Sequence, residues 1–188
     1  MISNVDKNFV ALCGYWECAG EPENPKWLKA YLDSGGVWTI GIGTIRYPNG
    51  KAVKKGDVIT AQEKDEYFLH EVRAKVDKVN FFTRDDINQH QFNATVDLAY
   101  NIGTTALQKS SLLEMLNKDL NSHLLVDKFL QWRFDNGKMI PGLLRRRMSD
   151  AYHYFTGQLK YDWKNYRTFT AATVNEVKEA IKSNSNCY

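Results

Sequence analysis

Residues 30–43, AYLDSGGVWTIGIG, have the pattern of a short antiparallel hairpin. Gly35 and Gly36 are a turn signal, and the segment from Val37 to Ile42 is rich in β-branched and aromatic residues, which favour strands. A second turn signal, Pro48-Asn49-Gly50, follows. We therefore predict a small antiparallel sheet over residues 28–46.

Helical patterns lie on both sides of this hairpin. Upstream, Asp6 is a plausible N-cap for a helix over residues 6–17, which ends at Glu17 before the helix breakers Pro22 and Pro25. Downstream, Thr60, Ser111 and Thr173 are expected to cap three helices, a helical run is expected from Asp86 to Ile102, and Pro141 suits the first turn of a further helix. Gly103 and Gly157 are the C-terminal signals.

The order of these elements predicts an α+β fold. A small antiparallel sheet lobe is expected over about residues 18–58. A larger helical lobe is expected over about residues 59–157, together with the N-terminal helix, and a ligand cleft is expected between the lobes. Residues 158–188 are expected to form a C-terminal extension to this 1–157 domain.

The bulk composition is that of an ordinary globular protein. Of 188 residues, 43% are hydrophobic and 25% are charged, and a formal charge of +3 does not require a nucleic-acid partner. No apolar stretch approaches the length of a membrane helix, and the polar N-terminus does not resemble a secretory signal. We therefore expect synthesis in the cytoplasm and no stable membrane insertion.

The cysteines and histidines give no sign of a metal centre. Cys13, Cys18 and Cys187 are odd in number and irregularly spaced, which favours reduced thiols over a disulfide framework. The histidines show none of the spacings typical of zinc ligands. We expect neither a metal nor a cofactor.

Several carboxylates flank the hairpin: Glu17, Glu21, Glu23 and Asp33. Hydrolysis of a glycosidic bond uses two carboxyl groups, one protonated to assist the leaving group and one ionised to activate water or act as a nucleophile. Composition alone gives this interpretation little weight, because acidic residues in loops are usually just solvated.

The hairpin closely resembles the signature of the phage-type lysozymes, the T4-like endolysins of glycoside hydrolase family 24. The match is densest at Ala30-Tyr31, Asp33, Gly36 and residues 39–43. It continues more loosely through residues 55–60, 99–103, 110–117 and 132–147. The resemblance covers about residues 9–157 and leaves the last thirty or so residues outside it.

This resemblance implies roles for particular residues. Glu17 matches the family's general acid, Asp33 its second carboxylate, and Thr39 a threonine that helps to hold the attacking water. Glu17 is expected to be desolvated beside Trp16, an environment that favours the protonated acid. Asp33, in a polar turn, is expected to be ionised.

Further contacts are implied around these groups. Ile42, Gly43 and Ser111 are expected to contact the glycan. One arginine of Arg145, Arg146 and Arg147 is expected to pair with the catalytic glutamate, with Arg145 as the first choice and the other two solvated.

The sequence departs from the family pattern in three places. Cys18 stands where glycine commonly follows the catalytic glutamate, and Thr44 stands where histidine is common. The stretch from Glu17 to Asp33 is longer than usual, so residues 18–26 are interpreted as an insertion. This insertion leaves Glu21 or Glu23 as alternative acids, although Pro22 and Pro25 favour Glu17.

The implied activity is that of a muramidase. Such an enzyme cleaves the β-1,4 bond between N-acetylmuramic acid and N-acetylglucosamine in peptidoglycan. The implied setting is a monomer made in the host cytoplasm that reaches the periplasmic wall, and lyses the host, after a holin opens the membrane. A prophage-derived toxin, a virion lysin and a catalytically dead peptidoglycan-binding module are the alternatives. Inversion or retention depends on the carboxyl separation.

Overall fold

The computed structural model describes residues 2, 4–33 and 35–184. The chain forms two compact units, which we call the smaller unit (Val10–Ala74) and the larger unit (Met1–Phe9 with Lys75–Tyr188). The boundaries fall inside two helices, α1 (Lys7–Glu17) and α2 (Ala61–Phe82). Helices make up 56% of the structure, so the predicted α+β class with a small hairpin and a larger helical part is confirmed.

The smaller unit contains the predicted hairpin. Strands β1 (Tyr31–Leu32) and β2 (Trp38–Thr39) pair antiparallel, with Tyr31 opposite Thr39. The strands are shorter than the predicted sheet, and beyond them only isolated bridges such as Ile40 with Thr44 continue the pairing among the described residues. Gly41 and Gly43 explain this, because both have positive φ and bend the chain out of a regular ladder.

A small apolar core supports the hairpin. Ile40, Val53 and Ile59 are buried together, and partly buried aromatic and aliphatic side chains pack around them. Helix α2 begins where predicted, because the Thr60 hydroxyl accepts the Glu63 amide proton at 3.1 Å and the Glu63 carboxylate accepts the Thr60 amide proton at 2.8 Å. The core and this cap hold the hairpin in place.

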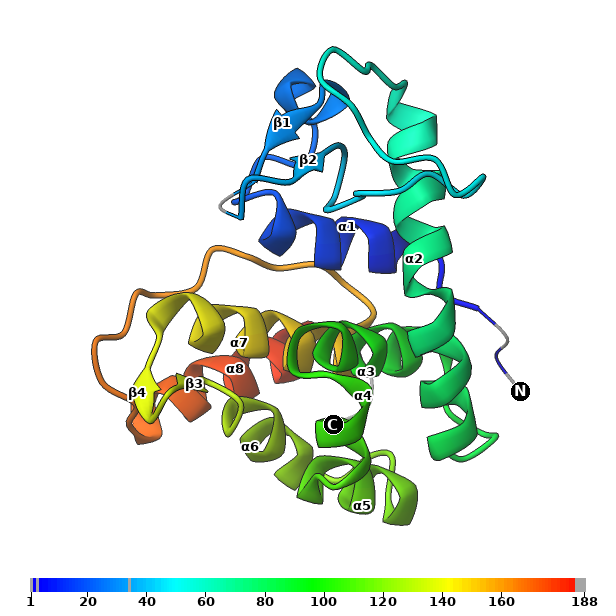
Figure 1. The fold of residues 1–188 in the computed structure, drawn as a ribbon. Coiled ribbons are helices and arrows are strands. Elements are labelled where there is room, and N and C mark those ends of the chain that lie inside the picture. Colours follow the sequence, from blue (N-terminus) through cyan, green and yellow to red (C-terminus); the bar gives the residue numbers. More distant parts are fainter. Residues whose placement is uncertain (1, 3, 34, 185–188) are drawn as a thin grey trace. The chain divides into compact units, whose positions relative to one another are not determined.

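The larger unit is mostly helical (Figure 1). Its elements are α3 (Gln89–Ile102), α4 (Thr104–Gln108), α5 (Ser111–Lys118), α6 (Leu124–Leu130), β3 (Phe134–Asp135), β4 (Lys138–Met139), α7 (Pro141–Thr156) and α8 (Ala171–Asn184). Helix α3 packs along α7, and α6 and α8 also pack against α7. Phe92, Val96 and Ala99 of α3 are fully buried, as their helical spacing predicted.

Several predicted helix starts were wrong by one to three residues. Helix α3 begins at Gln89, because Asn88 and Gln91 form a capping box there. In α5 the cap is Ser110, whose hydroxyl accepts the Leu113 amide proton at 3.1 Å, and Ser111 is the first helical residue. Helix α8 begins at Ala171, two residues before Thr173. The cap at Asp6 is confirmed, since its carboxylate accepts the Asn8 amide proton at 2.9 Å.

The described part of the C-terminal extension packs onto the larger unit. The Trp163 indole donates to the Ser149 hydroxyl at 2.9 Å, and its ring packs edge-on against Tyr152. Val177 and Ile181 of α8 are fully buried. Residues 158–184 are therefore part of this unit's core packing.

Within the described residues, no helix has both the length and the apolar character required to cross a membrane. In the same part of the chain, no group of three or more histidine, cysteine or acidic side chains is arranged to hold a metal ion. Cys13 and Cys18 are buried, and Cys187 lies outside the described residues.

Candidate active site

Glu17 is the last residue of α1. The helix stops there because Ala19 and Gly20 adopt positive φ values of 53° and 85°, and the Gly20 amide donates back to the Tyr15 carbonyl at 2.7 Å. Gly14 lets the helix approach the hairpin segment, since a Cβ at this position would lie 3.4 Å from Ile42 Cδ1. Glu17 is exposed, so the expected desolvation beside Trp16 is not observed.

Asp33 lies in the turn between β1 and β2. Its Oδ1 accepts amide protons from Gly35 at 2.8 Å and from Val37 at 2.9 Å. These bonds fix the carboxylate against its own turn and leave Oδ2 for another partner.

Thr39 lies next to that second oxygen. Its hydroxyl is 3.5 Å from Asp33 Oδ2 and 3.1 Å from the Val37 carbonyl oxygen, and the residue is only 3% exposed. A hydroxyl has one proton, so it can donate to only one of these acceptors at a time. With the proton on the shorter bond to Val37, Thr39 Oγ1 and Asp33 Oδ2 are both left as acceptors.

Tyr31, in β1, is partly buried. Burial raises the pKa of its phenol, and the electrostatic influence of Cys18 and of Asp33 raises it further. The phenol is thus within electrostatic range of both residues. Glu17, Asp33 and Thr39 all belong to the smaller unit.

The predicted insertion at 18–26 is a structured loop. It runs from the end of α1 into a 3₁₀ turn, η1 (Pro25–Leu28), which Asn24 caps by accepting the Lys26 amide proton at 3.0 Å. The Trp27 indole donates to the Glu21 carbonyl at 2.8 Å. Helix α1 does not continue into this loop, so Glu21 and Glu23 do not share the helical setting of Glu17.

Glu21 is also chemically unsuited to be the acid. Its carboxylate accepts a hydrogen bond from Lys26 Nζ at 3.1 Å and another from the Asn24 amide at 2.9 Å. These two bonds lower the pKa of Glu21 and so favour its ionised form, and the bond from Lys26 has the larger effect. Glu23 is exposed in the same loop.

The predicted substrate contacts have different settings. Gly43 is exposed on the hairpin with φ 88°. Ile42 is only 2% exposed and packs toward Gly14, so this residue offers almost no surface to a substrate. Ser111 is exposed at the start of α5, in the larger unit.

Thr44, which replaces the histidine common in the family, is 1% exposed. Its hydroxyl has no hydrogen-bond partner within the described part of the chain. A buried hydroxyl without a partner costs stability.

The expectation that two of the three arginines are solvated was wrong. Arg146 binds Asp97 through two nitrogens at 2.8 and 3.0 Å, and Arg147 Nε lies 2.9 Å from Asp150 Oδ2. Both arginines are buried in the larger unit, whereas Arg145 is partly exposed. Burial opposes the charged form of Asp97, but Arg146 outweighs it and lowers the Asp97 pKa.

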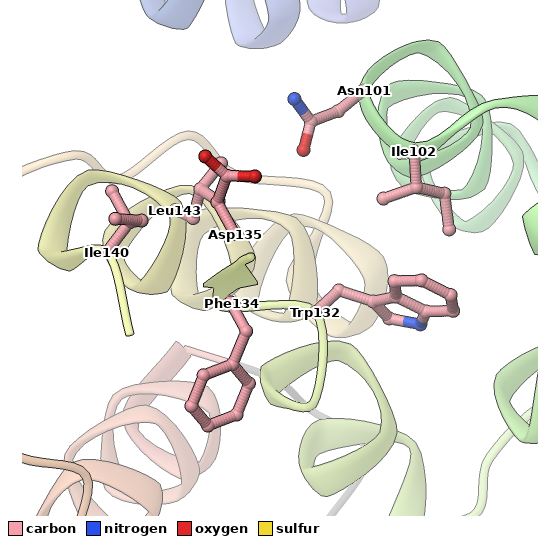
Figure 2. Close-up of a pocket in the computed structure, with 7 residues that line it drawn as sticks. All are labelled: Asn101, Ile102, Trp132, Phe134, Asp135, Ile140 and Leu143. Atoms are coloured by element: carbon pink, nitrogen blue, oxygen red, sulfur yellow. The ribbon is translucent and has the colours of Figure 1, made fainter. Parts of the chain in front are cut away.

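A pocket of about 560 Å³ lies in the larger unit and was not predicted (Figure 2). Its walls are mostly apolar, with two polar side chains, Asn101 and Asp135, that come from α3 and from the β3–β4 hairpin. Trp132 and Phe134 are its aromatic walls. None of the predicted catalytic residues lines this pocket.

The chain is similar to known endolysins in sequence and in fold. The chain is 34% identical to the endolysin of Bacillus phage PZA over 85% of its length, but it spans only 59% of that relative. It is 37% identical to the endolysin of Salmonella phage P22, over 64% of this chain and 81% of that one. The solved endolysin from Escherichia coli O157:H7 phage FAHEc1 superposes with a TM-score of 0.69 at 32% identity, covering 84% of this chain and 96% of the other.

The family described as phage lysozyme matches residues 26–150, a range that includes Asp33 and Thr39 and begins after Glu17 and most of the loop that follows it. This match covers well over half of the sequence. The chain therefore belongs to the phage lysozyme family.

Proposed function

We propose that this chain is a muramidase that hydrolyses the β-1,4 bond between N-acetylmuramic acid and N-acetylglucosamine in bacterial peptidoglycan. The observation that carries the proposal is the Asp33–Thr39 arrangement. One carboxylate oxygen is held by two backbone amides, and the other lies 3.5 Å from a buried hydroxyl. Membership of the phage lysozyme family and relatives named endolysins support the same activity.

The proposed reaction uses one proton donor and one proton acceptor. Glu17 gives its proton to the glycosidic oxygen as the bond from that oxygen to the anomeric carbon breaks. A water molecule held between Thr39 Oγ1 and Asp33 Oδ2 forms the new bond to that carbon, and its proton passes to Asp33. Because a water is expected at this carboxylate, we predict direct displacement with inversion, which NMR of the freshly released anomer measures.

The acid's partner and the other substrate contacts remain predictions. Arg145 is our first choice for the arginine that pairs with Glu17, and replacing Arg145, Arg146 and Arg147 one at a time by methionine tests that choice. Gly43 and Ser111, which are exposed, are proposed to contact the glycan, whereas the burial of Ile42 argues against the contact expected there.

We propose that the biological role is lysis of the bacterial host. The relatives named endolysins support this setting. In it, a monomer made in the host cytoplasm reaches the periplasmic peptidoglycan after a holin opens the membrane. Sedimentation of the purified chain tests the monomer, and lysis by cells that express it with or without a holin tests the release step.

The deciding experiment follows clearing of purified peptidoglycan and release of reducing ends, with mass spectrometry of the fragments. We expect the wild type to clear the suspension and to leave N-acetylmuramic acid at the reducing end, whereas Glu17→Gln and Asp33→Asn do not clear it. Glu21→Gln and Glu23→Gln are the matched controls and should stay active.

Each other outcome has a definite meaning. Wild-type protein that binds peptidoglycan without releasing reducing ends would be a binding module, and the enzymatic proposal would fail. Activity in Glu17→Gln together with its loss in Glu21→Gln or Glu23→Gln would move the acid into the loop.

A further inference from the structure

Lys64 is a buried lysine at an unexpected place. It lies in the first turn of α2 and is only 3% exposed. A positive charge at a helix N-terminus opposes the helix dipole, and burial of an ammonium group is costly without partners. The local helix therefore gives no reason for a lysine here, and its contacts outside α2 must account for it.

The ammonium group of Lys64 holds the loop that follows Glu17. Its Nζ donates to the Pro22 carbonyl oxygen at 2.8 Å, across 42 positions of sequence, and lies 3.5 Å from Asp65 Oδ1. It is also close enough to Cys18 to oppose the effect of burial, which raises the pKa of that thiol to about 11. The charge is thus within electrostatic range of Cys18, the residue that directly follows α1.

The aliphatic part of the same side chain supports the hairpin. A Cβ built on Gly41 would lie 3.3 Å from Lys64 Cγ, so the lysine packs directly beneath the bend that follows Thr39. The Gly41 amide in turn donates to the Trp27 carbonyl at 2.9 Å. Lys64 therefore contacts both the loop after Glu17 and the bend that follows Thr39.

We propose that Lys64 is a positioning residue that fixes the 18–28 loop against the hairpin and so sets the placement of Glu17 relative to Asp33 and Thr39. This inference rests on the proposed function, because it assigns these three residues to the reaction. Lys64 binds Pro22, within the segment that we interpret as an insertion. The lysine therefore compensates for the added length between Glu17 and Asp33.

Kinetics of three variants test the proposal. Lys64→Met keeps the length and apolar stem but removes the charge and the donor, and we expect kcat to fall about 10-fold or more with KM changed less than about twofold. Lys64→Arg keeps a charged donor and should recover part of kcat. Lys178→Met, which removes a partly exposed lysine that is paired with Asp127 at 3.3 Å in the larger unit, is the control and should match the wild type.

Amide hydrogen exchange distinguishes a positioning role of Lys64 from global unfolding of the variant and from failure of the proposed function. In Lys64→Met, exchange should quicken at loop amides such as those of Glu21 and Trp27, while α3 amides stay protected as in the wild type. Unchanged loop exchange or unchanged kcat in Lys64→Met would overturn the inference, as would a loss of activity that follows global unfolding. If the wild type is inactive, the proposed function fails, and the exchange result alone decides whether Lys64 fixes the loop.

Discussion

At the scale of single residues, the hydroxyl of Thr39 is the most informative atom of the site. Replacement by valine keeps the shape of the buried side chain and removes one of the two proposed acceptors for the attacking water. We expect kcat to fall on the order of 10- to 100-fold, the scale of losing the orientation of a reacting group, with little change in KM. Thr39→Ser keeps the hydroxyl and should retain most of the activity, measured by release of reducing ends.

Thr44 gives a prediction on stability instead of activity. Its hydroxyl is buried, and no partner for it occurs in residues 2, 4–33 and 35–184. Thr44→Val removes that unpaired group, so we expect the free energy of unfolding to rise by about 1 kcal/mol. Urea denaturation of both proteins measures this, and a less stable valine variant would show that the hydroxyl has a partner in solution.

At the scale of secondary-structure elements, α5 gives a paired test of the corrected cap. Ser110 accepts the Leu113 amide proton, whereas Ser111 already lies inside the helix. Ser110→Ala should therefore lower the free energy of unfolding by about 1 kcal/mol, and Ser111→Ala should leave it nearly unchanged. Equal losses in thermal denaturation of the two variants would contradict this assignment.

Local sequence signals predicted most of the elements but not how they end or which polar groups are buried. The hairpin was predictable because β-branched residues and paired glycines decide it locally. The cap at Ser110 could not be separated from Ser111, because both residue types suit an N-cap. Helices α4 and α6 and the β3–β4 hairpin were missed, since short elements have weak periodicity.

The candidate site likewise contains residues that local sequence could predict and residues that it could not. Asp33 and Thr39 could be predicted together because six residues of one hairpin bring them to 3.5 Å. Lys64 could not, because its partner Pro22 is 42 positions away. The burial of Arg146 and Arg147 was also missed, because it depends on Asp97 in another helix. Contacts between residues that are far apart in the sequence produce no local sequence pattern from which they could be predicted.

At the scale of the whole molecule, the described C-terminal extension is tied to α7 by a histidine. His153 is fully buried, and its Nδ1 lies 3.1 Å from the Gln158 carbonyl oxygen, so Nδ1 must carry the proton. Its Nε2 is buried, and nothing in the described part of the chain accepts a proton from it. Protonation of this nitrogen would place an unpaired charge in the interior of the larger unit.

The pKa of His153 follows from this setting. Burial lowers it, and the smaller effect of the nearby His90 acts in the same direction. The hydrogen bond to Gln158 and the charges of Asp6 and Asp97 raise it, but they do not outweigh burial. In the unfolded chain, with a pKa near the ordinary value of 6.5, this histidine binds a proton that the folded chain excludes.

The stability of the protein should therefore depend on pH in a definite direction. Above pH 6.5 the histidine is neutral in both states and its contribution is fully present. As the pH falls below 6.5, the unfolded state gains the proton first, so the free energy of unfolding falls until the lower folded pKa is reached. A single titrating group changes the free energy of unfolding by at most about 1.4 kcal/mol per pH unit. The depressed pKa of Asp97 acts in a separate window, below its ordinary value of 3.8.

Urea denaturation from pH 8 to pH 5 measures this slope. His153→Gln cannot take up a proton and should show a shallower dependence, although it will be less stable overall because the buried ring is lost. His70→Gln, at an exposed position of α2, is the control and should retain the wild-type slope. If His153→Gln and the wild type lose stability equally as the pH falls, the buried histidine does not set the pH dependence, and other titrating groups must.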